Sequence, residues 1–312
     1  MRQRLLATIA ATLTLALHPL AARAADVQLE VWDGQRAMSD IADLLRFTPR
    51  AIDTPGHDAA IDYIKAAMGK TSADVVTTQR WTFTDTAGKP HAMTNIIARF
   101  QPANPHRIIV ATHYDSIVRA YRDTTNPDGP MPGANNSASG VAVLLETARV
   151  LTLLPKPAVG IDMIFFDGEE GPKALGAGDP NWMAIGSPYF VAHLHDYYPA
   201  QKPEKAVVFD MVCDKDLHLQ PEPSSLADAP GEVKKFWTAG MAIAPKAFST
   251  RSTSYPISDD HTALNGAGIP SFLVIDFEYE PYFNTTQDTI DKCSADSLQA
   301  VGRTLLQYLY LR

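Results

Sequence analysis

The sequence contains few cysteines. Only Cys213 and Cys293 occur in 312 residues, so the chain is not one of the small scaffolds that depend on many disulfide bridges. An oxidising compartment would permit the two to pair, but their separation in the sequence is no evidence that they lie close together. We expect two separate buried thiols, with a single bridge as the alternative.

The sequence also has no excess of basic residues. Lys and Arg number 27 against 35 Asp and Glu, and the formal net charge at pH 7 is −8. A surface of this sign repels a phosphate backbone and an anionic membrane, so we expect no nucleic-acid partner. The hydrophobic share of 46% and the charged share of 20% are typical of a globular protein. Repeats, low-complexity tracts and linkers are absent from the sequence.

A long apolar run occurs only near the N-terminus. Arg2 and Arg4 precede the run LLATIAATLTLAL, and a small-residue pattern, AARA, ends at Ala24. This arrangement is typical of a secretory signal peptide, and the run is too short to span a bilayer comfortably. We therefore expect residues 1–24 to be removed and residues 25–312 to form one domain. The expected location is periplasmic or secreted, without a stable membrane anchor.

Near-continuous apolar runs indicate strands that are buried on both faces. Such runs cover residues 107–115, 161–170 and 206–212, and shorter strand patterns cover 74–84 and 93–100. Apolar residues at helical spacing predict helices, and these lie within 36–69 (two helices), 137–151, 187–197, 231–243 and 294–310. The alternation of the two element types predicts an α/β fold, with a mixed, largely parallel central sheet sandwiched between helices.

Polar residues cluster where three of these strands end. The first strand ends in His113-Tyr114-Asp115, the second in Asp167-Gly168-Glu169-Glu170, and the third in Asp210. Ligands of open α/β sheets bind beyond the carboxyl ends of the strands, and clustered carboxylates repel one another unless a cation lies among them. Histidine with carboxylates is a ligand set suited to zinc. Of two adjacent glutamates, one can bind a metal while the other stays free as a base.

At this point the sequence resembles a known family, the zinc aminopeptidases of the bacterial leucyl aminopeptidase type, which includes the glutaminyl cyclases. The similarity runs from about residue 36 to the C-terminus. Six blocks occur in the order of the family: ATHYDS, PGANNSASG, FFDGEE, VVFDMV, SDDHTALNGAGIPSFLVID and NTTQDTID. The resemblance implies one zinc-exopeptidase-like domain with a mixed eight-stranded sheet between helices.

The resemblance also implies roles for particular residues. His113 and Asp210 match ligands of one zinc ion, and Glu170 matches a ligand of the other. Glu169 matches the general base, which in cyclases shuttles a proton. Asp115 matches the carboxylate that orients the ligand histidine. Asp260 matches an acidic residue of the cyclase proton network.

Two positions depart from the family pattern. Asn136 stands where the family has an aspartate that bridges both metals, and Asn284 stands where it has the last histidine ligand. An amide oxygen can coordinate a metal, but it carries no charge to offset two dications. We therefore expect an impaired zinc site that binds one ion, or two at most, and weakly. His261, His193 and His195 are candidate replacement ligands, and Cys213 is a further candidate.

Three functions fit these observations. In a zinc-dependent aminopeptidase, metal-bound water would attack a peptide bond with Glu169 as base. In a glutaminyl-peptide cyclotransferase, the substrate's own amine would attack its side-chain amide; the paired acids of Asp259-Asp260-His261, and Trp182 in the loop after Glu170, favour this reading slightly. The third is a non-catalytic descendant that binds peptide N-termini, which the two asparagines favour. The expected partner is a peptide or small amide, with Trp182 and His261 predicted to contact it.

Overall fold

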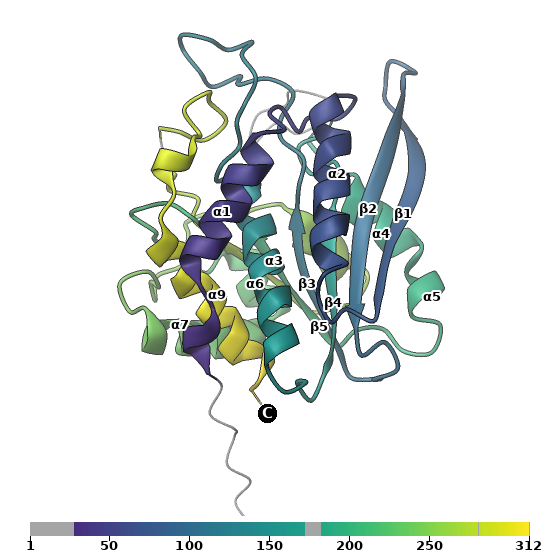
Figure 1. Cartoon of the computed structure of the whole chain (residues 1–312), viewed down its shortest axis with the longest axis vertical. Coiled ribbons are helices and arrows are strands. Elements are labelled where there is room, and N and C mark those ends of the chain that lie inside the picture. The colour runs from purple at the N-terminus through teal and green to yellow at the C-terminus, as the bar shows by residue number, and fades with distance from the viewer. Residues whose placement is uncertain (1–27, 172–181, 280, 312) are drawn as a thin grey trace, which may run out of the picture.

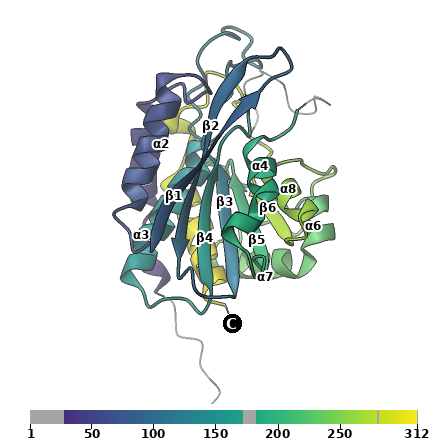
Figure 2. The ribbon, with the colours of Figure 1, turned by 90° about the vertical axis from the view of Figure 1, so that its right-hand side faces the viewer.

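The computed structural model describes residues 28–171, 182–279 and 281–311. Within them, six strands form one sheet in the order β1-β2-β4-β3-β5-β6. Strand β2 runs antiparallel to β1 and β4, whereas β4, β3, β5 and β6 are parallel to one another. Helices cover both faces of this sheet (Figures 1 and 2). The α/β fold with a mixed, largely parallel sheet is thus confirmed, whereas the signal peptide predicted over residues 1–24 lies outside the described residues.

The helices and strands match the ranges predicted from the sequence, except that β6, α6 and α8 were not predicted. The strands are β1 Val75–Thr84, β2 Pro90–Phe100, β3 Arg107–His113, β4 Gly160–Phe166, β5 Lys205–Asp210 and β6 Ser271–Ile275. The α-helices are α1 Gly34–Leu45, α2 Pro55–Met68, α3 Ala138–Leu153, α4 Gly186–Ala192, α5 Leu194–Tyr197, α6 Pro223–Asp228, α7 Pro230–Ile243, α8 Asp260–Gly266 and α9 Ala295–Leu309. Short 3-10 helices occupy η1 Leu29–Val31 and η2 Ile290–Lys292. None of the described helices is long and apolar enough to cross a membrane.

The parallel strands separate two apolar cores. Every residue of β3 and β4 is buried, and successive side chains point to opposite faces of the sheet. Val110 packs in the core formed with α1, α2, α3, α7 and α9, whereas its neighbour Ile109 packs in the core formed with α4, α5 and α8. This two-sided burial explains why these strands are continuous apolar runs in the sequence.

The strand number implied by the resemblance differs from the structure. Eight strands were expected, and the described residues form six. In the loops, Leu219 and Phe248 form one isolated bridge, and Asp214 and Cys293 form another. These single bridges do not continue into ladders among the described residues.

The expectation of two separate thiols is wrong, because Cys213 and Cys293 form a disulfide. Cys213 follows β5 by three residues, and Cys293 precedes α9. The backbone holds the two segments together, since the N–H group of Ser294 donates to the carbonyl oxygen of Cys213 at 2.8 Å. The bridge therefore fastens the loop after Asp210 to the segment that contains Asn284.

Removing this bridge should destabilise the fold. The bridge joins residues 80 positions apart, and closing a loop of that length lowers the entropy of the unfolded chain. For the double variant C213A/C293A we expect the free energy of unfolding to fall by about 2–5 kcal/mol in urea denaturation. Wild type treated with dithiothreitol is the matched control and should behave like the variant. An unchanged urea midpoint in both samples would contradict this prediction.

Candidate active site

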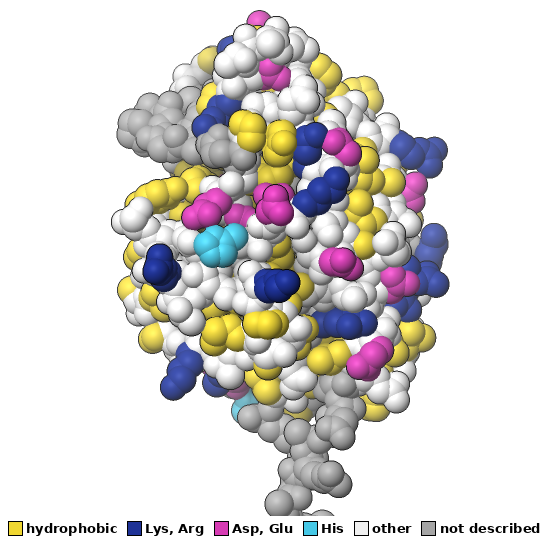
Figure 3. All heavy atoms as spheres, turned by 90° about the vertical axis from the view of Figure 1, so that its left-hand side faces the viewer, with side chains coloured by type: hydrophobic (Ala, Val, Ile, Leu, Met, Phe, Trp, Pro, Cys, Tyr) yellow, Lys and Arg dark blue, Asp and Glu magenta, His cyan; other side chains and the backbone are white. Residues whose placement is uncertain are grey.

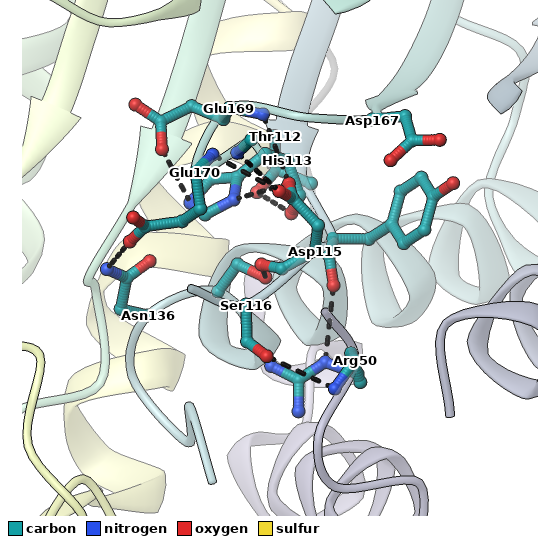
Figure 4. Close-up of polar contacts among 12 residues, drawn as sticks. Arg50, Thr112, His113, Asp115, Ser116, Asn136, Asp167, Glu169 and Glu170 are labelled. Carbon is teal, nitrogen blue, oxygen red and sulfur yellow. Dashed lines mark hydrogen bonds and ion pairs between the residues drawn. The ribbon is translucent and has the colours of Figure 1, made fainter. Parts of the chain in front are cut away.

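The parallel strands bring the predicted polar residues to one edge of the sheet. Nε2 of His113, at the end of β3, lies 3.2 Å from Oδ1 of Asp210, at the end of β5. Oε2 of Glu169, in the loop after β4, lies 3.9 Å from the same nitrogen (Figure 4). The side chain of His113 is 1% exposed, whereas those of Asp210 and Glu169 are 9% and 10% exposed. The two carboxyl groups are therefore both more accessible to a substrate than the histidine.

Asp115 organises both the histidine and the glutamate loop. Its Oδ1 lies 3.3 Å from Nδ1 of His113. Its carboxylate also accepts the backbone N–H groups of Glu169, Glu170 and Gly171, each at 3.2 Å. Gly168 and Gly171 have φ near +70°, a conformation that glycine adopts without strain. The loop thus folds around one buried carboxylate, with the two glutamate side chains directed to different neighbours (Figure 4).

A second group contains the two asparagines. Nδ2 of Asn136 donates to Oε1 of Glu170 at 2.6 Å and lies 3.2 Å from Oδ1 of Asn284. Asp288 fixes the loop that carries Asn136, because its carboxylate accepts the backbone N–H groups of Asn135 and Asn136 at 2.8 and 3.0 Å. Asn136, Glu170 and Asn284, three of the predicted metal ligands, therefore lie together. Hydrogen bonds from the side-chain amide of Asn136 join them.

Burial dominates the electrostatics of the site. It raises the pKa of Glu169 well above its usual value and that of Glu170 to about 8. Burial opposes a charge on His113, but the carboxylates of Glu169, Asp115 and Asp210 together raise its pKa well above the usual value. Each ring nitrogen of His113 therefore faces a carboxylate.

The SDDH segment forms the start of α8 and adds two further acids. Burial raises the pKa of Asp259 to about 6 and that of Asp260 well above its usual value. Asp260 accepts a hydrogen bond from Ser187 at 2.5 Å. His261 is fully buried, and its Nε2 lies 3.3 Å from Glu222. The structure thus places His261 against a carboxylate inside the protein, and its predicted contact with the substrate stays a prediction.

Among the described residues, no hydrogen bond, ion pair or ring contact joins the remaining sequence candidates to the acidic group. Trp182 is half-buried and directly follows the undescribed segment 172–181. Within the described chain, no hydrogen bond or ring contact joins it to Glu169 or Asp260. His193 packs on Tyr189, with ring centroids 4.1 Å apart, and His195 is exposed on α5. The substrate-binding role of Trp182 stays a prediction.

Arg50 is a site residue that the sequence did not reveal. It lies between α1 and α2 and is fully buried. Its guanidinium donates to the carbonyl oxygens of Tyr114, Pro132 and Gly133 at 3.2, 2.8 and 2.8 Å, and its backbone N–H donates to Ser116 (Figure 4). Burial lowers the pKa of Arg50 to about 10, so it stays charged at neutral pH. No motif surrounds it in the sequence, and only the folded chain shows that it supports the loop before Asn136.

The donor set does not fit the pair of zinc ions that the resemblance implies. Asn136 and Asn284 are neutral at positions where charged or nitrogen ligands were expected, and the Asn136 amide donates to the other two members of its group. His113 is engaged by Asp210 and Asp115. In the described ranges, no three His, Cys, Asp or Glu side chains are placed to hold a metal ion.

Buried acids should make the protein most stable in mild acid. Burial raises the pKa of Asp40, Asp276 and Asp288 to about 6 in the folded protein. Between pH 4 and pH 6 the folded state binds more protons than the unfolded state at these groups, so the free energy of unfolding should fall as pH rises through about 4–6. Urea denaturation across this window measures the slope.

Asp40→Asn is the matched variant for this measurement. The asparagine oxygen can still accept the hydrogen bond that Tyr63 donates to Asp40 at 2.7 Å, but the titrating group is gone. The slope between pH 4 and pH 6 should therefore be smaller in the variant than in wild type. A wild-type stability that increases over the same range would show that burial does not dominate these groups.

One face of the molecule carries charges of both signs. On the described part of the face in Figure 3, Lys and Arg side chains are interspersed with Asp and Glu.

Comparisons with known proteins agree with this arrangement. Aminopeptidase YwaD of Bacillus subtilis (strain 168) is 30% identical over 228 residues, which is 69% of this chain and 44% of the relative. The chain thus spans less than half the length of that protein. A glutaminyl-peptide cyclotransferase of Boiga irregularis is 26% identical over 254 residues, 70% of this chain and 66% of the relative.

Solved structures of both kinds share the fold. The glutaminyl cyclase of Tannerella forsythia matches with a TM-score of 0.82 and 30% identity, covering 90% of this chain and 99% of that structure. A Zn-dependent exopeptidase from Parabacteroides distasonis ATCC 8503 matches with a TM-score of 0.82 and 28% identity, with the same coverage. These neighbours support a hydrolase-like enzyme without distinguishing the reaction. The model of peptidase family M28 matches residues 95–309, and the chain belongs to this family.

Proposed function

We propose that the protein acts on the amino ends of peptides and cyclises an N-terminal glutamine, with Glu169 as the acid and base. The observation that supports this most directly is the free carboxyl group of Glu169 at the edge of the acidic group. It is 10% exposed and lies 3.9 Å from His113. Its raised pKa brings it closer to the operating pH, which is where a group that both takes and gives a proton works best.

The reaction needs no water, because the substrate supplies both the nucleophile and the amide that it attacks. The α-amine of the glutamine attacks the side-chain carbonyl carbon, and a carbon–nitrogen bond forms. Glu169 takes the proton that the amine loses. The same proton then passes to the leaving nitrogen, the side-chain carbon–nitrogen bond breaks, and ammonia is released. Asp210 and Asp259 lie close enough to influence the proton affinity of Glu169.

The aminopeptidase reaction expected from the sequence is less well supported by this site. Peptide-bond hydrolysis in zinc enzymes depends on a metal that lowers the pKa of its bound water. Here Asn136 and Asn284 supply no charge, and the amide of Asn136 hydrogen-bonds Glu170 at 2.6 Å. A reaction in which the substrate provides its own nucleophile avoids that requirement.

A second candidate is a non-catalytic site that binds peptide N-termini. The hydrogen bonds that join Asn136 to Glu170 and Asn284 favour it. Through them, the Asn136 amide already occupies polar groups of Glu170 and Asn284 that a reacting substrate would otherwise contact. In this case the acidic group would hold the α-ammonium of the peptide by charge alone. The two candidates share the ligand and differ in turnover.

One assay separates these functions. EDTA-treated full-length protein is incubated with a peptide that begins with glutamine and, separately, with an aminoacyl-nitroanilide. We expect the glutamine peptide to lose one ammonia, detected by mass spectrometry, and the anilide to remain intact. Release of a free amino acid or nitroaniline would contradict the cyclase proposal. Binding of the peptide in calorimetry without any product would favour the second candidate.

Export is part of the same proposal and rests on residues 1–24. If the AARA pattern is cleaved after Ala24, the intact mass of exported protein should correspond to a chain that begins at Ala25. The measurement requires expression of the full sequence in a bacterial host and fractionation of the cells. A full-length chain recovered in the membrane fraction would contradict cleavage.

A further inference from the structure

His57 forms a buried pair with Asp167, which stands two positions before Glu169. Nε2 of His57 lies 2.8 Å from Oδ1 of Asp167, and the two side chains are 3% and 0% exposed. A buried carboxylate needs a partner, and this partner comes from outside the sheet, since His57 lies in the first turn of α2. The pair therefore fastens a helix to the loop that carries Glu169.

Hydrogen bonds to β2 also fix Asp167. Its Oδ2 accepts the backbone N–H of Thr94 at 2.6 Å, and its own backbone N–H donates to Oδ1 of Asn95 at 2.9 Å. Figure 4 shows its carboxylate directed away from that of Glu169. Asp167 thus joins α2 and β2 to the end of β4, and the side chain of Glu169 stays free of these contacts.

Tyr114 completes this buried group from the end of β3. Its ring stacks on that of His57, with centroids 5.4 Å apart, and its hydroxyl donates to the carbonyl oxygen of Thr94 at 2.8 Å. Its backbone N–H donates to Phe166, the last residue of β4, at 3.1 Å. Because Tyr114 directly follows His113, the group also holds the strand end that carries this histidine.

The backbone of Glu169 lies between two fixed points. On one side, Asp167 is paired with His57. On the other, Asp115 accepts the backbone N–H groups of Glu169 and of the two residues after it. Gly168 connects the first point to Glu169 with φ of 70°, and glycine resists backbone rotation less than any other residue. The position of Glu169 therefore depends on how firmly Asp167 is held.

We propose that His57 is a positioning residue, which acts through Asp167 to hold Glu169 where it can reach the substrate amine. A displacement of about 1 Å in a reacting geometry can cost about 10²-fold in rate, so a looser loop should lower turnover. The effect on turnover rests on the proposed function. The effect on the order of the loop does not.

Hydrogen exchange measures the order of the loop without any activity. In the full-length protein, His57→Phe keeps a ring beside Tyr114 but has no nitrogen to pair with Asp167. We expect the backbone N–H groups of residues 168–171 to exchange about 10–10²-fold faster than in wild type, which is the factor for one lost hydrogen bond to a charged group. Mass spectrometry of proteolytic peptides that cover this segment measures the rates.

Turnover of a peptide with N-terminal glutamine should follow the loop. In His57→Phe the kcat should fall about 10–10²-fold with little change in KM, because every group that can contact the substrate remains. His57→Gln is the conservative variant, since its amide nitrogen can take the place of Nε2 and donate to Asp167. It should restore both the exchange rates and the kcat. A merely structural residue would lower the amount of folded protein and leave the kcat of the folded fraction unchanged.

Tyr198→Phe is the matched control for a lost buried hydrogen bond. It removes the hydroxyl that donates to Asp162 at 2.7 Å, and Asp162 lies near the opposite end of β4. The Tm should fall, whereas exchange at residues 168–171 and the kcat should match wild type. If His57→Phe fails to fold because the Asp167 carboxylate is left unpaired, the double variant H57F/D167N, which buries no unpaired charge, replaces it with the same expectations.

Three results would overturn the proposal. The first is unchanged exchange of the loop in His57→Phe or the double variant. The second is a His57→Gln variant that is impaired as severely as His57→Phe. The third, in an active wild type, is faster exchange with an unchanged kcat. If the loop exchanges faster but wild type never cyclises the peptide, the hold of His57 on the loop stands and the cyclase reaction is rejected.

Discussion

Replacing Glu169 with glutamine should lower the turnover of a peptide with N-terminal glutamine by about 10²–10⁴-fold. The reason is that glutamine has nearly the same shape but cannot take a proton from the α-amine or return one to the leaving nitrogen. The KM should change little, because glutamine keeps nearly the same shape and polarity at this position. Steady-state kinetics on the variant, with product detected by mass, measure both constants.

The fold should survive this substitution. The backbone N–H of Glu169 donates to Asp115, and that hydrogen bond does not involve the side chain. Removing a carboxyl group whose pKa is raised by burial also removes a destabilising charge, so the Tm should stay the same or rise. Glu278→Gln is the matched control, because its carboxylate is 62% exposed and contacts His218 at 3.1 Å. If Glu169→Gln kept full turnover, Glu169 would not be the acid and base of the reaction.

The cluster of polar residues at one edge of the sheet could be predicted from the sequence, because the direction of the strands determines it. Parallel strands place their carboxyl ends together, so polar residues at the ends of three apolar runs had to meet. The structure accordingly places a carboxyl oxygen of Glu169 and one of Asp210 within 4 Å of Nε2 of His113. The burial of β3 and β4 on both faces follows from the same apolar runs.

Other features depended on contacts that the sequence does not encode locally. Arg50 lies in a turn between two helices, and its partners are carbonyl oxygens 64 to 83 positions away, so no motif marks it. The pairing of Cys213 with Cys293 depends on how the loop after β5 meets the start of α9. His261 was expected to contact the substrate, and its burial against Glu222 depends on the packing of α8.

The two asparagines determine how the site can bind a metal. In the wild type both amides are neutral, and the nitrogen of the Asn136 amide faces Glu170 and Asn284. Zinc prefers charged or nitrogen ligands, so this group fits zinc poorly. Substitution at the same two positions should therefore restore zinc binding.

The double variant N136D/N284H should convert the site to a zinc site. The aspartate adds a second charged ligand beside Glu170, and the histidine adds the nitrogen ligand that zinc prefers. Histidine is also one of the few residues that tolerate the left-handed φ of 53° at position 284. We expect the affinity for zinc to rise by about 10²-fold or more over wild type, measured by calorimetry and by elemental analysis of dialysed protein.

The single variants are the controls for this conversion. Metal ligands act as a unit, so N136D and N284H alone should each raise the affinity for zinc only slightly. The gain in the double variant should exceed the product of the two single gains. His113, Asp210 and Glu169 already lie together, and the zinc-loaded double variant should therefore gain peptidase turnover that wild type lacks with zinc. Tight binding of two zinc ions by wild type, with ordinary peptidase turnover, would show that neutral amide ligands suffice and that the substitutions carry no functional meaning.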